Sequence, residues 1–238
     1  MKQKVTLNQL YLMLTTLFSV VLVLTNIIGV KLFQGPFNPT SLALTTGIIT
    51  YPVTFLLTDV VSEIWGEKKA NAMVIIGFLM SFVMLIFIQI AIHLPAHPYW
   101  VAPNNPFGFE TVGEYQNAFN AVFSVNGKLL FGSMLAYMVA QLLDVRLYHM
   151  LRRLTKGKYL WIRNNGSTSI SQLVDTFIVN SILFYWGFGW EFWQGISVML
   201  TIYIYKLILA ALDTPLIYLS VAIIKKKFDL PNATAEYS

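Results

Sequence analysis

Seven charged side chains lie inside the long apolar segments of this sequence, where a charge is difficult to accommodate. They are Asp59, Glu63, Asp144, Arg146, Asp175, Lys206 and Asp213. A carboxylate or ammonium group at the centre of a bilayer costs at least about 2.5–3.5 kcal/mol. Since five of the seven are acidic and two are basic, the bases cannot neutralise all the acids. Some acids must be protonated, solvated in a cavity or paired with a ligand, which predicts a buried polar site.

Two of these acids stand three residues after a glutamine, in the pairs Gln141/Asp144 and Gln172/Asp175. Residues three apart share one face of a helix, so each pair presents an amide and a carboxylate together. Such a pair can bind adjacent N–H donors and a carbonyl oxygen, which is the pattern on the Watson–Crick edge of a guanine-like base. On spacing alone, Gln172 and Asn180 are candidate substrate-binding residues.

Purely structural roles are the alternative for these charges. Asp144 and Arg146 could form a positioning pair near the membrane interface, with the Arg146 side chain extending to water. Lys206 and Asp213 are seven residues apart, which places them on similar faces of one helix two turns apart. They could form an interhelical pair with Asp175.

The composition defines the elements that must position these residues. Of 238 residues, 56% are hydrophobic and 11% are charged, and the mean hydropathy is +0.63. A soluble domain has about 25% charged residues, so the sequence indicates an integral membrane protein. The absence of cysteine excludes disulfides and a thiol nucleophile. The net charge is +5, and the basic residues lie between the apolar segments. This distribution indicates membrane topology and no nucleic-acid partner.

Six apolar segments fit transmembrane helices in one all-α domain, residues 1–238. The predicted spans are residues 9–31, 41–63, 71–93, 128–150, 168–188 and 196–224. The first is too long for a signal peptide and is interpreted as a span. The second is diluted by threonines and by Tyr51-Pro52, and Glu63 at its end could simply be solvated. In the long connection 94–127, Tyr115 to Phe123 is predicted to form a short interfacial helix.

The distribution of lysine and arginine predicts the orientation. If the N-terminus is cytoplasmic, 12 of the 16 basic residues fall on the cytoplasmic side. The positive-inside rule therefore predicts that both termini are cytoplasmic. The repeated fragments Gln141-Leu-Leu-Asp144 and Gln172-Leu-Val-Asp175 occur in adjacent antiparallel spans, which favours an inverted repeat of the kind found in secondary transporters.

Motifs for enzymes and cofactors are lacking in the sequence. There is no Walker A motif, dinucleotide-binding glycine motif or nucleophile elbow, and the three histidines do not have metal-binding spacing. We therefore expect a non-enzymatic protein with no cofactor and no metal. Asp144 and Asp175 on adjacent helices leave an intramembrane aspartyl hydrolase as an alternative, although its Tyr-Asp and Gly-x-Gly-Asp motifs are absent.

At these same residues the sequence resembles the queuosine precursor transporter family, also known as the vitamin uptake transporter type (DUF165-like). The resemblance covers about residues 25–220. It rests on Thr25-Asn26-Ile-Ile-Gly29-Val-Lys31, Tyr51-Pro52-Val-Thr-Phe55, Asp59-Val-Val-Ser-Glu63-Ile-Trp65-Gly66, Gln141-Leu-Leu-Asp144, Tyr148, Arg163, Ser167-Thr168-Ser169, Asp175-Thr176-Phe177, Tyr205-Lys206 and Thr214-Pro215-Leu-Ile-Tyr218. Trp65 is a mild departure, because a smaller aromatic residue is expected there.

The resemblance implies an inner-membrane importer of 7-deazaguanines such as preQ0, preQ1 or queuine, the precursors of the tRNA nucleoside queuosine. Its motifs carry over a set of candidate pocket residues. They are Asn26, Asp59, Glu63, Gln141, Asp144, Asp175 and Lys206. We expect the substrate between spans two, four, five and six, with alternating access to the two sides of a bacterial plasma membrane.

Other interpretations stay open at this point. The chain could be the substrate-binding component of an ECF-type vitamin importer, which would need an energising partner, or a receptor or scaffold. As an autonomous carrier it could be a proton symporter or a facilitator followed by metabolic trapping. A homodimer is compatible with the sequence, which identifies no interface.

Overall fold

The protein is a bundle of long helices, seen in a computed structural model that describes residues 5–29, 31–34, 43–100, 108–123 and 127–231. The α-helices are α1 Leu7–Ile28, α2 Tyr51–Trp65, α3 Glu67–His93, α4 Val112–Phe123, α5 Gly127–Leu154, α6 Leu160–Ser181 and α7 Phe192–Phe228. The shorter elements are β1 Leu32–Gln34, β2 Ala43–Thr45, the 3₁₀ turns η1 Thr46–Ile49 and η2 Pro98–Trp100, and the π-helical turn η3 Ile182–Gly187.

Local chemistry sets several of the helix ends. Thr6 and Gln9 form a capping box that begins α1, each side chain bonding the other's backbone N–H. Pro52 lies in the first turn of α2, where its missing N–H costs no helical hydrogen bond. Gly66 separates α2 from α3 with φ +82°, a left-handed conformation that favours glycine. This residue lets the chain reverse between two helices with no longer connection.

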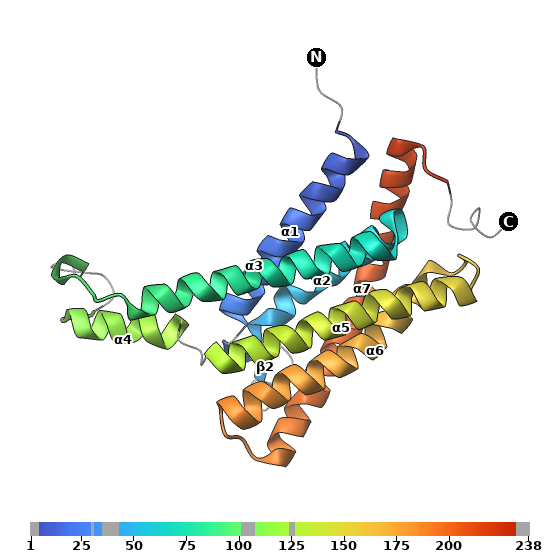
Figure 1. Ribbon diagram of the computed structural model, residues 1–238. Coiled ribbons are helices and arrows are strands. Elements are labelled where there is room, and N and C mark those ends of the chain that lie inside the picture. The colour runs from blue at the N-terminus through green and yellow to red at the C-terminus, as the bar shows by residue number, and fades with distance from the viewer. Residues whose placement is uncertain (1–4, 30, 35–42, 101–107, 124–126, 232–238) are drawn as a thin grey trace.

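The helix α2 occupies the middle of the bundle. It packs against α1, α3, α5 and α7, while α1, α3, α5, α6 and α7 follow one another in an arc of packed neighbours. Figure 1 shows α3, α5 and α6 running side by side, with the start of α1 and the end of α7 at one end of the bundle. The α2–α3 and α5–α6 junctions lie at that end too.

The bundle is apolar outside and polar inside. On α6 the buried face carries Arg163, Asn164, Gln172 and Asp175, and the exposed face carries apolar residues such as Ile170. In α7, leucine and isoleucine side chains are exposed along the whole helix. This distribution is the reverse of a soluble protein's and suits a hydrocarbon solvent.

Three helices are long and apolar enough to cross a membrane on composition alone. They are α1, α3 and α7. The helix α2 has only 15 residues, and α5 and α6 carry many polar side chains. The polar residues that lower the hydropathy of α6 are mostly those buried against other helices. The prediction of six spans is thus supported for three segments by hydropathy, and the other three stay a prediction.

The second predicted span, residues 41–63, is not a single helix. Its first part contains the strand β2 and the turn η1, and only α2 is helical. The strands β1 and β2 pair antiparallel, with Phe33 opposite Leu44, so the all-α prediction is wrong in this detail. Leu44 and Ile48 are buried against Met199 and Ile202 of α7. The hairpin therefore covers the bundle at the end opposite the start of α1 and the end of α7.

The remaining segments follow the predictions more closely. The helix predicted for Tyr115 to Phe123 is confirmed as α4, which begins three residues earlier, and its position at the membrane interface stays a prediction. The span predicted for 168–188 begins earlier, at Leu160, and its α-helical part ends at Ser181 before the π-helical turn. The last predicted span, residues 196–224, is extended by four residues at each end in α7, which continues through Pro215.

Candidate functional site

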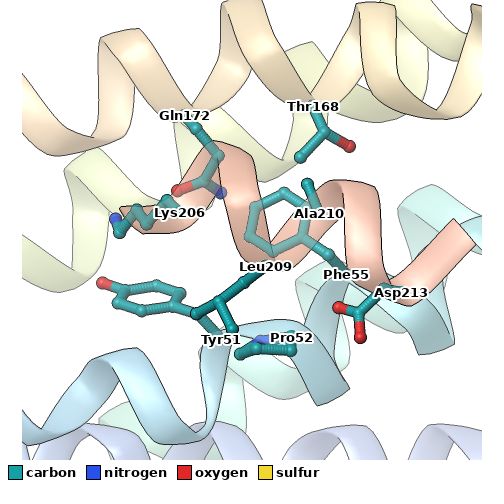
Figure 2. Close-up of a pocket in the computed structure, with 9 residues that line it drawn as sticks. All are labelled: Tyr51, Pro52, Phe55, Thr168, Gln172, Lys206, Leu209, Ala210 and Asp213. Atoms are coloured by element: carbon teal, nitrogen blue, oxygen red, sulfur yellow. The ribbon is translucent and has the colours of Figure 1, made fainter. Parts of the chain in front are cut away.

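A cleft of about 260 Å³ lies between α2, α6 and α7. Its walls combine aromatic, aliphatic and charged side chains (Figure 2), namely Tyr51, Pro52, Phe55, Thr168, Gln172, Lys206, Leu209, Ala210 and Asp213. In the arrangement described here the cleft is narrow, with enclosed room for about one water molecule, so a larger solute requires the surrounding helices to separate. The cleft is mostly apolar with a few converging polar groups, which is the usual character of a small-molecule site.

The positive charge at the cleft belongs to Lys206, which is 5% exposed. Its ammonium group donates to the carboxylate of Asp175 on α6, with Nζ 2.6 Å from Oδ2. The same ammonium group lies 3.9 Å from the ring centroid of Tyr51, a cation–π contact. The interhelical pair of Lys206 and Asp175 foreseen from the sequence is therefore present. It leaves the second oxygen of Asp175 without a hydrogen bond.

A second polar group surrounds Tyr137 on α5. The Tyr137 hydroxyl donates to Thr54 Oγ1 at 2.9 Å and accepts from the amide nitrogen of Gln141 at 2.6 Å. The rings of Tyr51 and Tyr137 are 5.6 Å apart, which connects this group to the cleft. Gln141 is fully buried, and its amide oxygen has no partner.

The two glutamine–aspartate pairs contribute five of the buried polar atoms that have no hydrogen-bond partner within the described residues. Both amide atoms of Gln172 are buried without a partner, although the residue lines the cleft. Asp144 accepts a hydrogen bond from the Ser171 hydroxyl at 2.8 Å, and its other oxygen has none. Buried polar groups are nearly always satisfied in native proteins. This cluster of exceptions indicates a place where a polar solute completes the hydrogen bonding.

Asp59 is the most isolated acid in this region. It is 1% exposed, and neither of its carboxyl oxygens has a hydrogen-bond partner within the part of the chain that the structure describes. Asp59 lies on α2, one turn beyond Phe55 of the cleft wall, so it stands behind the cleft and does not line it.

Glu63 forms an ionic cluster at the end of the bundle where α1 begins and α7 ends. Its Oε2 accepts from Arg163 Nη2 at 2.7 Å and from the Tyr148 hydroxyl at 2.9 Å, and its Oε1 accepts from Lys225 Nζ at 3.1 Å. Arg152 Nη1 is 3.9 Å from Oε2. The ionic cluster, defined as Glu63, Tyr148, Arg152, Arg163 and Lys225, joins α2, α5, α6 and α7.

Two predicted site residues lie elsewhere. Asn26 of α1 donates to the Ser81 hydroxyl of α3 at 3.0 Å and lines a separate cavity between α1, α3 and α5. Asn180 donates to the carbonyl of Thr176 on its own helix at 2.7 Å.

Of the predicted site residues, Gln172 and Lys206 line the cleft. Asp175 pairs with Lys206, Asp144 bonds Ser171 beside Gln172, and Gln141 bonds Tyr137, whose ring lies near Tyr51 of the cleft. Asp59 stands one turn behind the cleft, and Asn26, Asn180 and Glu63 lie apart from it.

Sequence reasoning on charges missed the apolar half of the site. Tyr51 and Phe55 line the cleft four residues apart on α2, and their spacing on one helical face was the available signal. The charge of Arg146 points away from the site, because this residue is exposed while Asp144 is fully buried. Within the described residues these two form no ion pair, so the positioning pair considered for them is absent.

A helical bundle with an apolar exterior and a small cleft of unsatisfied polar groups defines an integral membrane protein that handles a small solute. The chain belongs to the family described as "Putative vitamin uptake transporter", which matches residues 45–220. This range includes the cleft and every residue of the ionic cluster except Lys225. Membership of a transporter family supports a membrane transport protein over an enzyme.

Two curated relatives carry the name "Probable queuosine precursor transporter". The protein of Bacillus subtilis (strain 168) is 29% identical over 180 residues, which cover 74% of this chain and 71% of the relative. The protein of Haemophilus influenzae (strain ATCC 51907 / DSM 11121 / KW20 / Rd) is 28% identical over 151 residues, covering 63% of this chain and 56% of that relative. No solved structure matches the chain significantly.

Proposed function

We propose that this protein imports queuosine precursors, 7-deazaguanines such as preQ0, preQ1 or queuine, across a bacterial plasma membrane. The observation that carries the proposal is the group of buried, unpartnered polar atoms on Gln141, Asp144, Gln172 and Asp175 beside the cleft. The names of the two relatives support the same class of substrate.

The polar atoms match the edge of a guanine-type base. That edge carries two N–H donors next to a carbonyl acceptor. Gln172 offers a free amide oxygen and a free amide nitrogen at the cleft, and Asp175 offers one free carboxylate oxygen a single turn further along α6. A deazaguanine can therefore satisfy groups that are otherwise left unpaired in a low-dielectric core, where each is costly.

The cleft also provides flat apolar surfaces for the base. Tyr51 and Phe55 form one wall, and Leu209 with Ala210 forms part of the other. An aromatic ring can stack on the face of a planar heterocycle, and this contact adds to the area that is removed from water.

Transport requires the cleft to open to each side in turn. We propose six membrane crossings with both termini in the cytoplasm. The basic residues at the end of the bundle that holds the ionic cluster support this orientation. In this arrangement the ionic cluster closes the cytoplasmic end and the β1–β2 hairpin closes the outer end. The inverted repeat predicted around Asp144 and Asp175 would supply the two related halves that exchange these closures.

The test is uptake of labelled preQ0, preQ1 and queuine into proteoliposomes that contain only this purified protein. Gln172→Ala removes two hydrogen-bonding atoms from the cleft, and we expect uptake at limiting substrate to fall about tenfold or more, since a hydrogen bond lost there is worth about 1–1.5 kcal/mol. Gln116→Ala is the matched control, because Gln116 lies on α4 and bonds Asn120.

The outcomes separate the candidate functions. Uptake that fails in Gln172→Ala and persists in Gln116→Ala supports an autonomous carrier with its site in the cleft. Binding without uptake would contradict autonomous transport and identify a component that needs an energising partner. Neither binding nor uptake of the three compounds would refute the proposed substrate class.

A further inference from the structure

Two buried carboxyl groups, those of Asp59 and Asp144, lie between the cleft and the ionic cluster. Along α2, Tyr51, Phe55, Asp59 and Glu63 recur every four residues and so follow one face of the helix. The first two line the cleft and the last is the centre of the ionic cluster. Asp59 is therefore about one helical turn from Phe55 of the cleft and from Glu63 of the ionic cluster.

These two acids form no ion pair within the described residues. The Asp59 carboxyl has no hydrogen bond at either oxygen. Asp144 accepts the 2.8 Å bond from Ser171, and the hydroxyl groups of Ser167 and Thr168 also act on it, so its partners among the described residues are neutral. By contrast, Asp175 is neutralised by Lys206 at 2.6 Å, and Glu63 is neutralised by three bases of the ionic cluster. Among these four acids, Asp59 and Asp144 are therefore the two that lack a basic partner within the described residues.

The charged groups that act on Asp59 come from α2, α5, α6 and α7. They are acidic in three cases, Glu63, Asp144 and Asp213, and basic in one, Arg163. The phenol of Tyr148 also faces this position and donates to Glu63. Negative charge around Asp59 adds to the cost of ionising it.

Among the described residues, the cation that acts on Asp59 is Arg163, and it already donates hydrogen bonds to other acceptors. Arg163 donates through Nη2 to Glu63, through Nε to the Tyr148 hydroxyl at 3.2 Å, and through Nη1 to the carbonyls of Gly157 and Lys158 at 2.9 and 3.1 Å. All three of its nitrogens are thus engaged. Arg163 contributes positive potential at Asp59 and forms no bond with it.

An ionised carboxylate in a low-dielectric interior without a partner is too costly to persist, so such a group is neutralised by a proton. We propose that Asp59, together with Asp144, is the proton-binding site of the transporter and that import of substrate is coupled to inward movement of one proton. This inference rests on the proposed function, since it names the driving ion of the same transport cycle.

The proton balance of the cycle is simple. The Asp59 carboxyl takes up one proton when the cleft is open to the outside, and its O–H bond persists in the closed arrangement described here. When the ionic cluster separates, water reaches Asp59, the O–H bond breaks, and the proton passes to that water. The carboxylate left behind is stabilised by the positive charge of Arg163, which therefore favours release at this end of the bundle. No oxidation or reduction is involved.

A direct test of the proton needs no substrate. Infrared spectroscopy of the purified protein at neutral pH distinguishes a protonated carboxyl group from a carboxylate by its C=O stretching band. We expect a protonated-carboxyl band that loses intensity in Asp59→Asn and is unchanged in the control Glu67→Gln, which removes an acid at the start of α3. Absence of the band from the unmodified protein, or an unchanged band in Asp59→Asn, would overturn the proposal.

Proteoliposome uptake tests the coupling itself. For one proton per substrate, an outside-acid gradient of about one pH unit should raise the steady-state accumulation about tenfold, and Asp59→Asn should abolish this stimulation while Glu67→Gln keeps it. Uptake that ignores the gradient in the unmodified protein overturns the coupling and leaves the proposed transport function intact. If no precursor is taken up at all, the proposed function fails, and the infrared measurement still decides whether Asp59 holds a proton.

Discussion

At the scale of single residues, the polar core combines one satisfied ion pair with several unsatisfied groups. Lys206 and Asp175 neutralise each other at 2.6 Å, whereas within the described residues the side-chain polar atoms of Gln172 and Asp59 have no hydrogen-bond partner. A protein that needed these residues only to hold helices together would be expected to satisfy all of them. The pair therefore fixes the geometry of the cleft, and the unsatisfied groups remain for the transported species.

The Lys206–Asp175 pair provides a test of this division. Removing one partner leaves the other charge buried, which costs about 3–5 kcal/mol, whereas removing both charges costs much less. We expect Lys206→Met and Asp175→Asn each to lower the thermal unfolding temperature strongly, and the double variant to recover much of the loss. Thermal unfolding of detergent-solubilised protein measures this. A double variant as unstable as the sum of the single ones would contradict a direct pairing.

Much of the site could be predicted from the residues, but not their partners. Charge and spacing identified Asp144, Gln172, Asp175 and Lys206, because acids and amides in apolar segments are costly without a role. The same argument included Glu63, which the structure places in the ionic cluster. Spacing along one helix says nothing about the rotation of its neighbours, so the sequence left open which acid Lys206 would meet.

At the scale of elements, α1 and α3 approach closely at a glycine. A Cβ atom on Gly77 would lie 2.5 Å from Phe18 Cε1, and Phe18 is completely buried. Small residues at such positions let transmembrane helices pack against each other. The contact fixes α3 against the first helix, and with it one side of the bundle around α2.

This contact predicts different effects for two glycine substitutions. Gly77→Ala should lower stability by about 1–3 kcal/mol, because the added methyl group forces Phe18 to move in a packed core. Gly132→Ala on α5 should be tolerated, since a Cβ there would meet Ile182 at an ordinary 3.6 Å. The unfolding temperatures of the two variants in the same detergent provide the comparison. Equal stability of both would show that the α1–α3 contact is looser than described.

Element prediction succeeded where hydropathy and helix geometry agree, and failed at the second span. Residues 41–63 are long enough to cross a bilayer, but β2 and η1 occupy part of this range. The threonines and Pro52 that dilute the segment are the physical reason, since Pro52 is suited to the first turn of a helix and Thr residues favour extended backbone. Sequence alone could not show that Ala43–Thr45 pairs with Leu32–Gln34, which precedes it in the sequence.

At the scale of the whole molecule, the two ends of the bundle are closed by different means. The ionic cluster joins four helices at one end through charges, while the hairpin and the aromatic residues near η3 cover the other end through apolar packing. When water enters, it can solvate the separated charges of the ionic cluster, whereas parting the packed surface exposes apolar side chains to water. The ionic cluster is therefore the end expected to open first.

Opening of this end can be measured because the chain has no cysteine. A single Thr168→Cys substitution places the only thiol at the cleft wall. Adding Glu63→Gln removes the acid at the centre of the ionic cluster, and we expect labelling of Cys by a water-soluble maleimide to become about tenfold faster. Adding Glu67→Gln instead should leave the rate unchanged. Equal rates in all three proteins would exclude the ionic cluster as a closure.

The polar face of α6 has a consequence for how the protein is made. A new helix carrying Arg163, Asn164, Gln172 and Asp175 on one side is unfavourable alone in lipid. The acid that neutralises Arg163 lies on α2, which is synthesised before it, but the base that neutralises Asp175 lies on α7, which is synthesised after it. Insertion of α6 can therefore be completed only after α7 leaves the ribosome, and a nascent chain truncated between these helices should remain a substrate for membrane quality-control proteases.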